Sequence, residues 1–186
     1  MARPLAVALT GGIAAGKTEA LAAFARHGAA TSSADAVVHE LLATDEEVRA
    51  AIRERWGDDA VGDRARIGEL VFDDPPELEW LEQLLHPRVR RAQQDWLDSV
   101  EAPLAVVEIP LLYETGSETR FDAVVVITAP PELRMERRGA FADREARLIP
   151  DEEKVRRADF SYVNDGSLAD LDAFVAGVVD SLASSS

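Results

Sequence analysis

Short runs of apolar residues alternate along this chain with stretches in which apolar residues recur every three or four positions. The runs at 5–9, 104–109 and 123–128 predict strands buried on both faces of a sheet, because almost no polar residue interrupts them. Residues 29–33 and 160–163 show weaker patterns of the same kind. We therefore expect five strands, of which the first, third and fourth are the most deeply buried.

Helical spacing fills the stretches between these strands. It runs over 18–27, where Gly28 ends it, from Pro130 and Pro131 through Arg138, and over 168–182. Strands that alternate with helices predict an α/β fold, a parallel sheet with helices on both faces. Two segments interrupt the alternation: the helical stretch 36–100 and the polar stretch 139–157.

Composition restricts the functions open to this chain. Its 186 residues predict one compact domain with a small insertion, and its net charge of −15 argues against binding to nucleic acid or to an anionic membrane surface. It has no cysteine, which excludes disulfides, zinc–thiolate sites and cysteine nucleophiles. No apolar run reaches the ~20 residues of a membrane span. We expect a cytoplasmic protein.

One motif points directly to phosphate chemistry. Residues 11–18 match G-x-x-x-x-G-K-[ST] and lie between a predicted strand and a predicted helix, where such a loop can wrap its N–H groups around an anion. Lys17 is one of only two lysines in a chain that otherwise uses arginine, so a compact ammonium group is favoured here. It is suited to bridge the β- and γ-phosphates of ATP, and the Thr18 hydroxyl to hold Mg²⁺. The predicted ATP-binding residues are Gly11, Gly12, Ile13, Ala14, Ala15, Gly16, Lys17 and Thr18.

The segment of residues 134–157 is rich in basic residues, and two interpretations are open for it. It fits an arginine-bearing lid that closes over the transferred phosphoryl group, and it also fits a solvated helix with ion pairs between successive turns. The nearby phosphate loop favours the lid for the segment as a whole, whereas a structural role is equally open for each single arginine. The basic residues are Arg134, Arg137, Arg138, Arg144, Arg147, Lys154, Arg156 and Arg157.

Three further candidates follow from position. Glu108 ends an apolar strand, where an acid of a phosphate-loop fold faces the Mg²⁺ site. Ser33 and Asp35 follow the second strand, at the sheet edge where ligands bind. Asp35 could be a base near the acceptor or the N-cap of a helix over 36–42, and the local pattern favours the N-cap. His86 precedes Pro87 between two helical patterns, a position typical of a helix-end hydrogen bond.

These residues together resemble the dephospho-CoA kinase family nearly from end to end. Residues 8–18 are similar to its phosphate loop, including the Leu-Thr-Gly-Gly-Ile run that the general motif does not require. Residues 80–87 resemble its helix ending in Leu-His-Pro, and 108–114 its acid-x-Pro-Leu-Leu-x-Glu stretch. Residues 158–166 resemble its Ala-Asp pair and Asn-rich turn. Four matches in order are far more specific than the loop alone.

The resemblance implies a kinase of three parts. They are a phosphate-loop core of 1–35, 101–138 and 158–186, a helical acceptor-binding insertion of 36–100, and a short lid of 139–157. It implies ATP-dependent phosphorylation of the 3′-hydroxyl of dephospho-CoA. The roles it carries over are phosphate binding for residues 11–18, entry to the lid for Arg138, acceptor binding for His86, a place near the adenine for Asn164, and the second acid after strand two for Asp35. With the position arguments above, we expect catalysis by Lys17, Asp35 and Arg138, acceptor binding by Asp35 and His86, and Mg²⁺ at Thr18 and Glu108. We expect a monomer or small homo-oligomer.

The chain departs from the family pattern in two places. Ser33 stands where the family usually has the aspartate taken as the base, and a hydroxyl does not replace that carboxylate. The lid is shorter than usual and lacks the common Gln after Arg147. Two alternatives stay open at this point: a kinase of this fold with a nucleoside or nucleotide as acceptor, and a non-catalytic nucleotide-binding protein.

Overall fold

A parallel five-stranded sheet forms the centre of the larger part of the molecule. The computed structural model describes residues 3–138 and 148–184. The strand order is β2-β3-β1-β4-β5, and β1 pairs in parallel with both β3 and β4, as β4 does with β5. The strands are β1 Leu5–Gly11, β2 Ala30–Ser33, β3 Leu104–Glu108, β4 Ala123–Thr128 and β5 Phe160–Val163.

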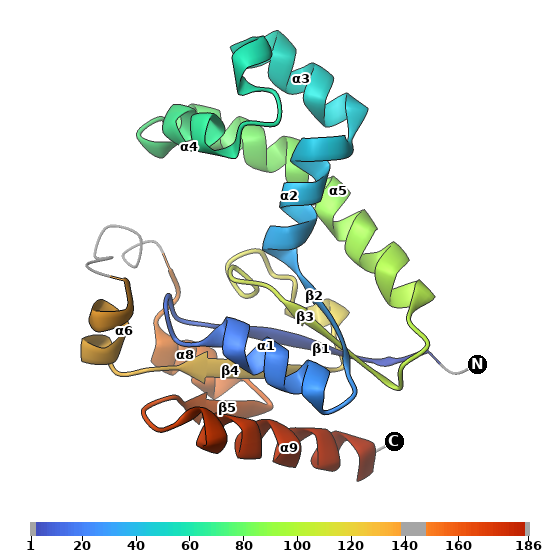
Figure 1. Ribbon diagram of the computed structural model, residues 1–186, viewed down its shortest axis with the longest axis vertical. Helices are drawn as coiled ribbons and strands as arrows, with labels where there is room; N and C mark the ends of the chain where they lie inside the picture. The colour runs from blue at the N-terminus through green and yellow to red at the C-terminus, as the bar shows by residue number, and fades with distance from the viewer. Residues whose placement is uncertain (1–2, 139–147, 185–186) are drawn as a thin grey trace. The chain divides into compact units, whose positions relative to one another are not determined.

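The chain divides into two compact units, Met1–Ser32 with Val100–Ser186, and Ser33–Ser99. In the first unit α1 and α9 pack against each other over one face of the sheet, while α8 contacts β4 from the other face (Figure 1). The helices of this unit are α1 Lys17–Arg26, α6 Pro131–Arg138, α8 Asp151–Arg157 and α9 Leu168–Ser184, with a 3₁₀ turn η2 at Glu118–Arg120.

Alternate positions of the central strands build the core of the first unit. Because successive side chains of a strand point to opposite faces, every second residue of β1 and β4 reaches the α1/α9 side. Burial of these branched side chains supplies the main driving force for folding this unit. The fully buried members of this cluster include Val7, Leu9, Phe24, Val125, Ile127 and Val175.

The second unit is entirely helical. Asp45 caps one of its helices, accepting hydrogen bonds from the N–H groups of Glu47 and Val48 at 3.0 Å each. Its apolar cluster is centred on Val48, Ile52 and Leu85. The helices are α2 Ala34–Thr44, α3 Glu46–Trp56, α4 Arg64–Phe72 and α5 Pro75–Ser99, with a 3₁₀ turn η1 at Asp58–Ala60.

The structure confirms the α/β fold and the five expected strands, with three differences. Residues 78–96, expected as two helical patterns, belong to one helix, α5, which continues through Pro87. Residues 151–157 of the polar stretch form α8, whereas 139–147 lie outside the described residues. Helix α2 begins at Ala34, so Asp35 lies in its first turn and its interpretation as an N-cap is wrong. Among the described residues, no helix is long and apolar enough to cross a membrane.

Candidate active site

The loop of residues 11–18 has the conformation that its glycines predict. It leaves the carboxyl end of β1 and enters α1 through Gly16, which is left-handed with φ 98°. Gly11 has φ 146° and passes so close to β4 that a β-carbon there would lie 1.8 Å from the Ile127 carbonyl oxygen. Ala14 also has a positive φ, 57°, a costly conformation for a residue with a side chain. Such strain is typical of a functional loop held by its surroundings.

Two side chains hold the loop in this shape. The Lys17 ammonium donates to the Gly12 carbonyl at 2.8 Å and to the Gly11 carbonyl at 3.2 Å. The side-chain amide of the buried Asn164 donates to the Ala15 carbonyl at 2.8 Å, and the Asn164 backbone N–H donates to the Thr128 carbonyl at 2.7 Å. Asn164 therefore supports the phosphate loop from the end of β5, a contact that the sequence did not reveal.

The end of β3 lies beside the approach to the loop. Glu108 pairs with Leu9 in the parallel register and is half-buried. One residue later, the Ile109 N–H donates to the Leu9 carbonyl at 2.9 Å. The buried Thr10 hydroxyl donates to the Pro110 carbonyl at 3.4 Å. Glu108 thus lies at the carboxyl end of a strand next to β1.

An ion pair lies over the start of the loop. The Arg134 Nη1 of α6 is 3.5 Å from the Asp151 Oδ2 of α8, with the two side chains 14% and 24% exposed. A β-carbon built on Gly12 would lie 2.7 Å from Arg134 Nη1 and 2.8 Å from Asp151 Oδ2. The pair therefore covers Gly12, and only a glycine leaves room for it.

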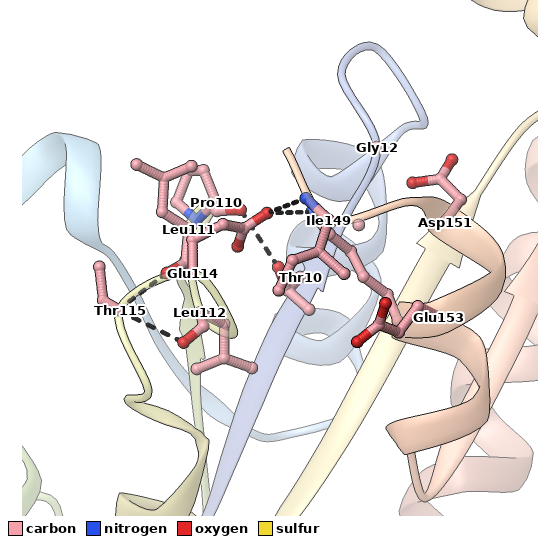
Figure 2. Close-up of polar contacts among 12 residues, drawn as sticks. Thr10, Gly12, Pro110, Leu111, Leu112, Glu114, Thr115, Ile149, Asp151 and Glu153 are labelled. Carbon is pink, nitrogen blue, oxygen red and sulfur yellow. Dashed lines mark hydrogen bonds and ion pairs between the residues drawn. The ribbon is translucent and has the colours of Figure 1, made fainter. Parts of the chain in front are cut away.

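A second, more deeply buried ion pair joins the turn after β3 to α8. Lys154, whose side chain is 1% exposed, lies 2.9 Å from Glu114 Oε1. The same oxygen accepts the Ile149 N–H at 3.1 Å. Figure 2 shows the Glu114 carboxylate between the Pro110 turn and Ile149, above Thr10. One carboxylate thus binds two points of the 149–154 segment.

The end of α8 is held by Arg157. Its guanidinium pairs with Glu118 and lies 4.2 Å from the centre of the Tyr113 ring. The Tyr113 hydroxyl is buried and has no hydrogen-bond partner among the residues described. Burial raises the pKa of Tyr113 above its usual value of 10.0, although the nearby Arg157 charge acts in the opposite direction.

A cavity of about 650 Å³ opens beside the loop. Apolar side chains from the ends of β4 and β5 and from α8 line much of it, and Arg134, Asp151 and Arg156 add charge. A mostly apolar cavity with a few charged groups is typical of a small-molecule site. Its lining includes Gly12, Ile13, Pro130, Pro131, Val155 and Val163.

Three further predicted residues lie outside the loop. Asp35, exposed in the first turn of α2, and half-buried His86, inside α5, belong to the helical unit. Arg138 ends α6, but its side chain is outside the described part of the structure. Three described members of the basic segment, Arg134, Lys154 and Arg157, form ion pairs with acidic side chains.

Comparison with known proteins places the chain among relatives of one family. The dephospho-CoA kinase family model matches residues 5–170. A dephospho-CoA kinase of Rhodopseudomonas palustris is 38% identical, with 96% of each chain covered. A crystal structure from Thermus thermophilus matches with a TM-score of 0.82 at 34% identity, covering 97% of this chain and 99% of that one. A dephospho-CoA kinase of Campylobacter jejuni matches with a TM-score of 0.68 at 27% identity, covering 97% and 98%.

Proposed function

Because the chain belongs to the dephospho-CoA kinase family, we propose that it transfers the γ-phosphoryl group of ATP to the 3′-hydroxyl of dephospho-CoA. The product is coenzyme A, so the reaction is the last step of its synthesis. The observation that carries the proposal is the phosphate loop, which is formed at the end of a buried strand and is held by Lys17 and Asn164. Family membership favours this acceptor over another nucleotide or nucleoside.

The loop supplies the contacts to the ATP phosphates. Residues 11–18 present successive backbone N–H groups, and the N-terminus of α1 adds partial positive charge. The Lys17 ammonium, bonded to two loop carbonyls, is already at the loop and can turn to the β- and γ-phosphates. Arg134 lies over Gly12 and is suited to the same phosphates. Fixed positive charge at these points stabilises the charge that develops during transfer.

The residues at the loop also fit Mg²⁺. The described residues contain no cluster of three acidic or His ligands that could hold a metal. In kinases, one or two protein oxygens hold Mg²⁺ together with the phosphates and water. Thr18, exposed at the start of α1, and Glu108, at the end of β3, would hold it. When bound, Mg²⁺ would neutralise part of the negative charge of the phosphates.

The cavity beside the loop is suited to the adenine of ATP. It begins at Gly12 and Ile13 and continues along Pro130, Pro131 and Val163, so a base can lie on apolar side chains while its phosphates reach the loop. Asn164 follows directly after this wall. Its amide is bonded to Ala15, so its contribution to ATP binding is to hold the loop.

The acceptor side of the reaction rests on the helical unit. We assign acceptor binding to the 36–100 insertion, including Asp35 and His86, and closure over the reacting phosphates to 139–157 with Arg138. Asp35 would accept or relay the proton of the 3′-hydroxyl, since Ser33 offers no carboxylate. Phosphoryl transfer through a loose transition state needs little help from a base, so Ser33 is compatible with activity. We place the reaction in the cytoplasm, where ATP is available, in a monomer or small homo-oligomer.

Transfer of labelled γ-phosphate tests the proposal. The purified protein is incubated with γ-phosphate-labelled ATP, Mg²⁺ and dephospho-CoA, and the product is separated and its phosphate located by phosphorus NMR. We expect the label in coenzyme A, on the 3′-oxygen. A label on another position, or no labelled product although ATP binds, would contradict the assignment.

A further inference from the structure

The buried Glu114–Lys154 pair has no part in the roles assigned above. We propose that Glu114 is a positioning residue of the ATP site: it holds the start of α8 in the place from which Asp151 and Arg134 cover Gly12. The inference rests on the proposed function, because its effect is measured on ATP. It assigns to Glu114 and Lys154 a role in nucleotide affinity, in addition to any role in folding.

The first step is that this ion pair is buried enough to fix what it joins. Lys154 is 1% exposed and Glu114 15%, and their charged atoms are 2.9 Å apart. Water has almost no access to the Lys154 side chain, so separating the charges is more costly than for an exposed pair. The Arg134–Asp151 contact, by comparison, is longer and less buried. The Glu114 pair is therefore the firmer of the two anchors.

The second step is the place of Glu114 beside the phosphate loop. It lies in the turn after β3, where Thr115 closes the turn by donating to the Leu111 carbonyl at 2.8 Å. The same turn is tied to β1 through the bond from Thr10 to Pro110. Figure 2 shows the Glu114 carboxylate between this turn and Ile149. Glu114 is thus fixed relative to β1, because its turn is bonded to Thr10, the residue before the loop begins.

The third step leads from Glu114 to Gly12. Glu114 binds the chain at Ile149 and at Lys154, on either side of Asp151. A residue held between two such points has little freedom to move. Asp151 in turn pairs with Arg134, and both lie within 3 Å of a β-carbon built on Gly12. The position of Arg134 over the loop therefore depends on the two contacts of Glu114, with Ile149 and with Lys154.

The experiment compares three variants with a matched control. The variants are Glu114→Gln, Lys154→Met and the double variant. The control is Asp122→Asn, because Asp122 also accepts one backbone N–H, from Ala6 at 2.8 Å, and pairs with one cation, Arg3, but at the amino end of the sheet. For each protein we measure Tm, the KM for ATP, the KM for dephospho-CoA, and ATP binding by equilibrium dialysis without acceptor.

A positioning role predicts a selective effect on ATP. Both single variants should raise the KM and Kd for ATP at least about tenfold, about 1.4 kcal/mol, while the KM for dephospho-CoA changes less than about twofold. The double variant removes the uncompensated buried charge, so we expect Tm to recover. The affinity for ATP should stay low, because the ion pair that joins the 149–154 segment to the turn after β3 is still missing. Asp122→Asn should leave both KM values unchanged.

A purely structural role predicts the opposite pattern. Recovery of ATP affinity together with Tm in the double variant would overturn the inference, as would equal losses for the two substrates or an equal ATP defect in Asp122→Asn. If a single variant does not fold, the double variant still decides between the two roles. A wild-type protein that binds ATP but transfers nothing to dephospho-CoA would refute the proposed function alone, since the dialysis measurement would still test Glu114.

Discussion

Two neighbouring glycines of the phosphate loop should respond very differently to the same added methyl group. At Gly11 the methyl would lie 1.8 Å from a backbone oxygen of β4, and the φ of 146° is one that residues with side chains rarely adopt. At Gly12 the nearest atoms, at 2.7 and 2.8 Å, are the ends of the Arg134 and Asp151 side chains, which can turn away. Gly12 also has no left-handed φ. Gly11→Ala thus strains the backbone, and Gly12→Ala displaces an ion pair.

The magnitudes separate the two variants clearly. For Gly11→Ala the backbone strain costs about 1–3 kcal/mol and the overlap with β4 about another 1–3 kcal/mol. That is a large share of the free energy of unfolding of about 5–15 kcal/mol for a typical domain. For Gly12→Ala the loss of stability is limited to the displaced ion pair, about 1 kcal/mol or less. Its effect on ATP should be larger, about 1.5–3 kcal/mol for one lost charged hydrogen bond from Arg134, or about ten- to a hundredfold in Kd.

Urea unfolding and equilibrium binding of ATP measure the two effects separately. Gly177→Ala is the control, because it lies inside α9 with no described atom within 4 Å of the added carbon, and alanine there should stabilise the helix by up to about 1 kcal/mol. Gly11→Ala should unfold at a much lower urea concentration than the wild type. Gly12→Ala should unfold near the urea concentration of the wild type but bind ATP more weakly. Wild-type stability of Gly11→Ala would refute the close approach to β4. Wild-type ATP affinity of Gly12→Ala would refute the role given to Arg134.

Three further predictions follow from single side chains. Lys17→Ala should lower phosphoryl transfer at least about a hundredfold in a protein that still folds, with a urea midpoint lowered only by the loss of its two hydrogen bonds to the loop, and near-normal turnover would overturn its assignment. Tyr113→Phe should raise the free energy of unfolding by up to about 1 kcal/mol, because it removes a buried hydroxyl without a described partner and keeps the ring under Arg157; a destabilised variant would show that the hydroxyl is bonded. The hydrogen bond from Arg3 lowers the pKa of Asp122 in the folded protein below its usual value of 3.8. The ionised Asp122 carboxylate therefore stabilises the fold fully above pH 3.8, and this stabilisation is lost as the pH falls through the lowered pKa. The stability difference between the wild type and Asp122→Asn should therefore shrink between pH 5 and pH 2 in urea unfolding, and a constant difference would argue against the pKa shift.

The sequence predicted those parts of the molecule whose structure depends on residues close together in the chain. The phosphate loop was predictable because one strand, one loop and one helix form it, and its glycines act on their own backbone. The buried strands were predictable because their residues are apolar on both faces. Asn164 was identified only through the family resemblance, and its bond to Ala15 became visible only in the folded chain.

The parts that the sequence did not predict depend on distant contacts. Nothing in the local pattern around Glu114 or Lys154 indicates that they pair, because the fold brings the turn after β3 to α8. Helix α5 continues through Pro87, a residue that usually ends a helix. Packing explains this continuation, since Leu85 before the proline and Leu97 after it are both buried. Such tertiary packing outweighs local preference.

The central claim, ATP-dependent phosphorylation of dephospho-CoA, is tested most directly by ADP release from the purified protein. ATP and Mg²⁺ are supplied with dephospho-CoA, with AMP, or with no acceptor. We expect release with dephospho-CoA and none above background with AMP or without acceptor. Release with AMP alone would contradict the acceptor, and no release with any acceptor, together with measurable ATP binding, would contradict catalysis itself.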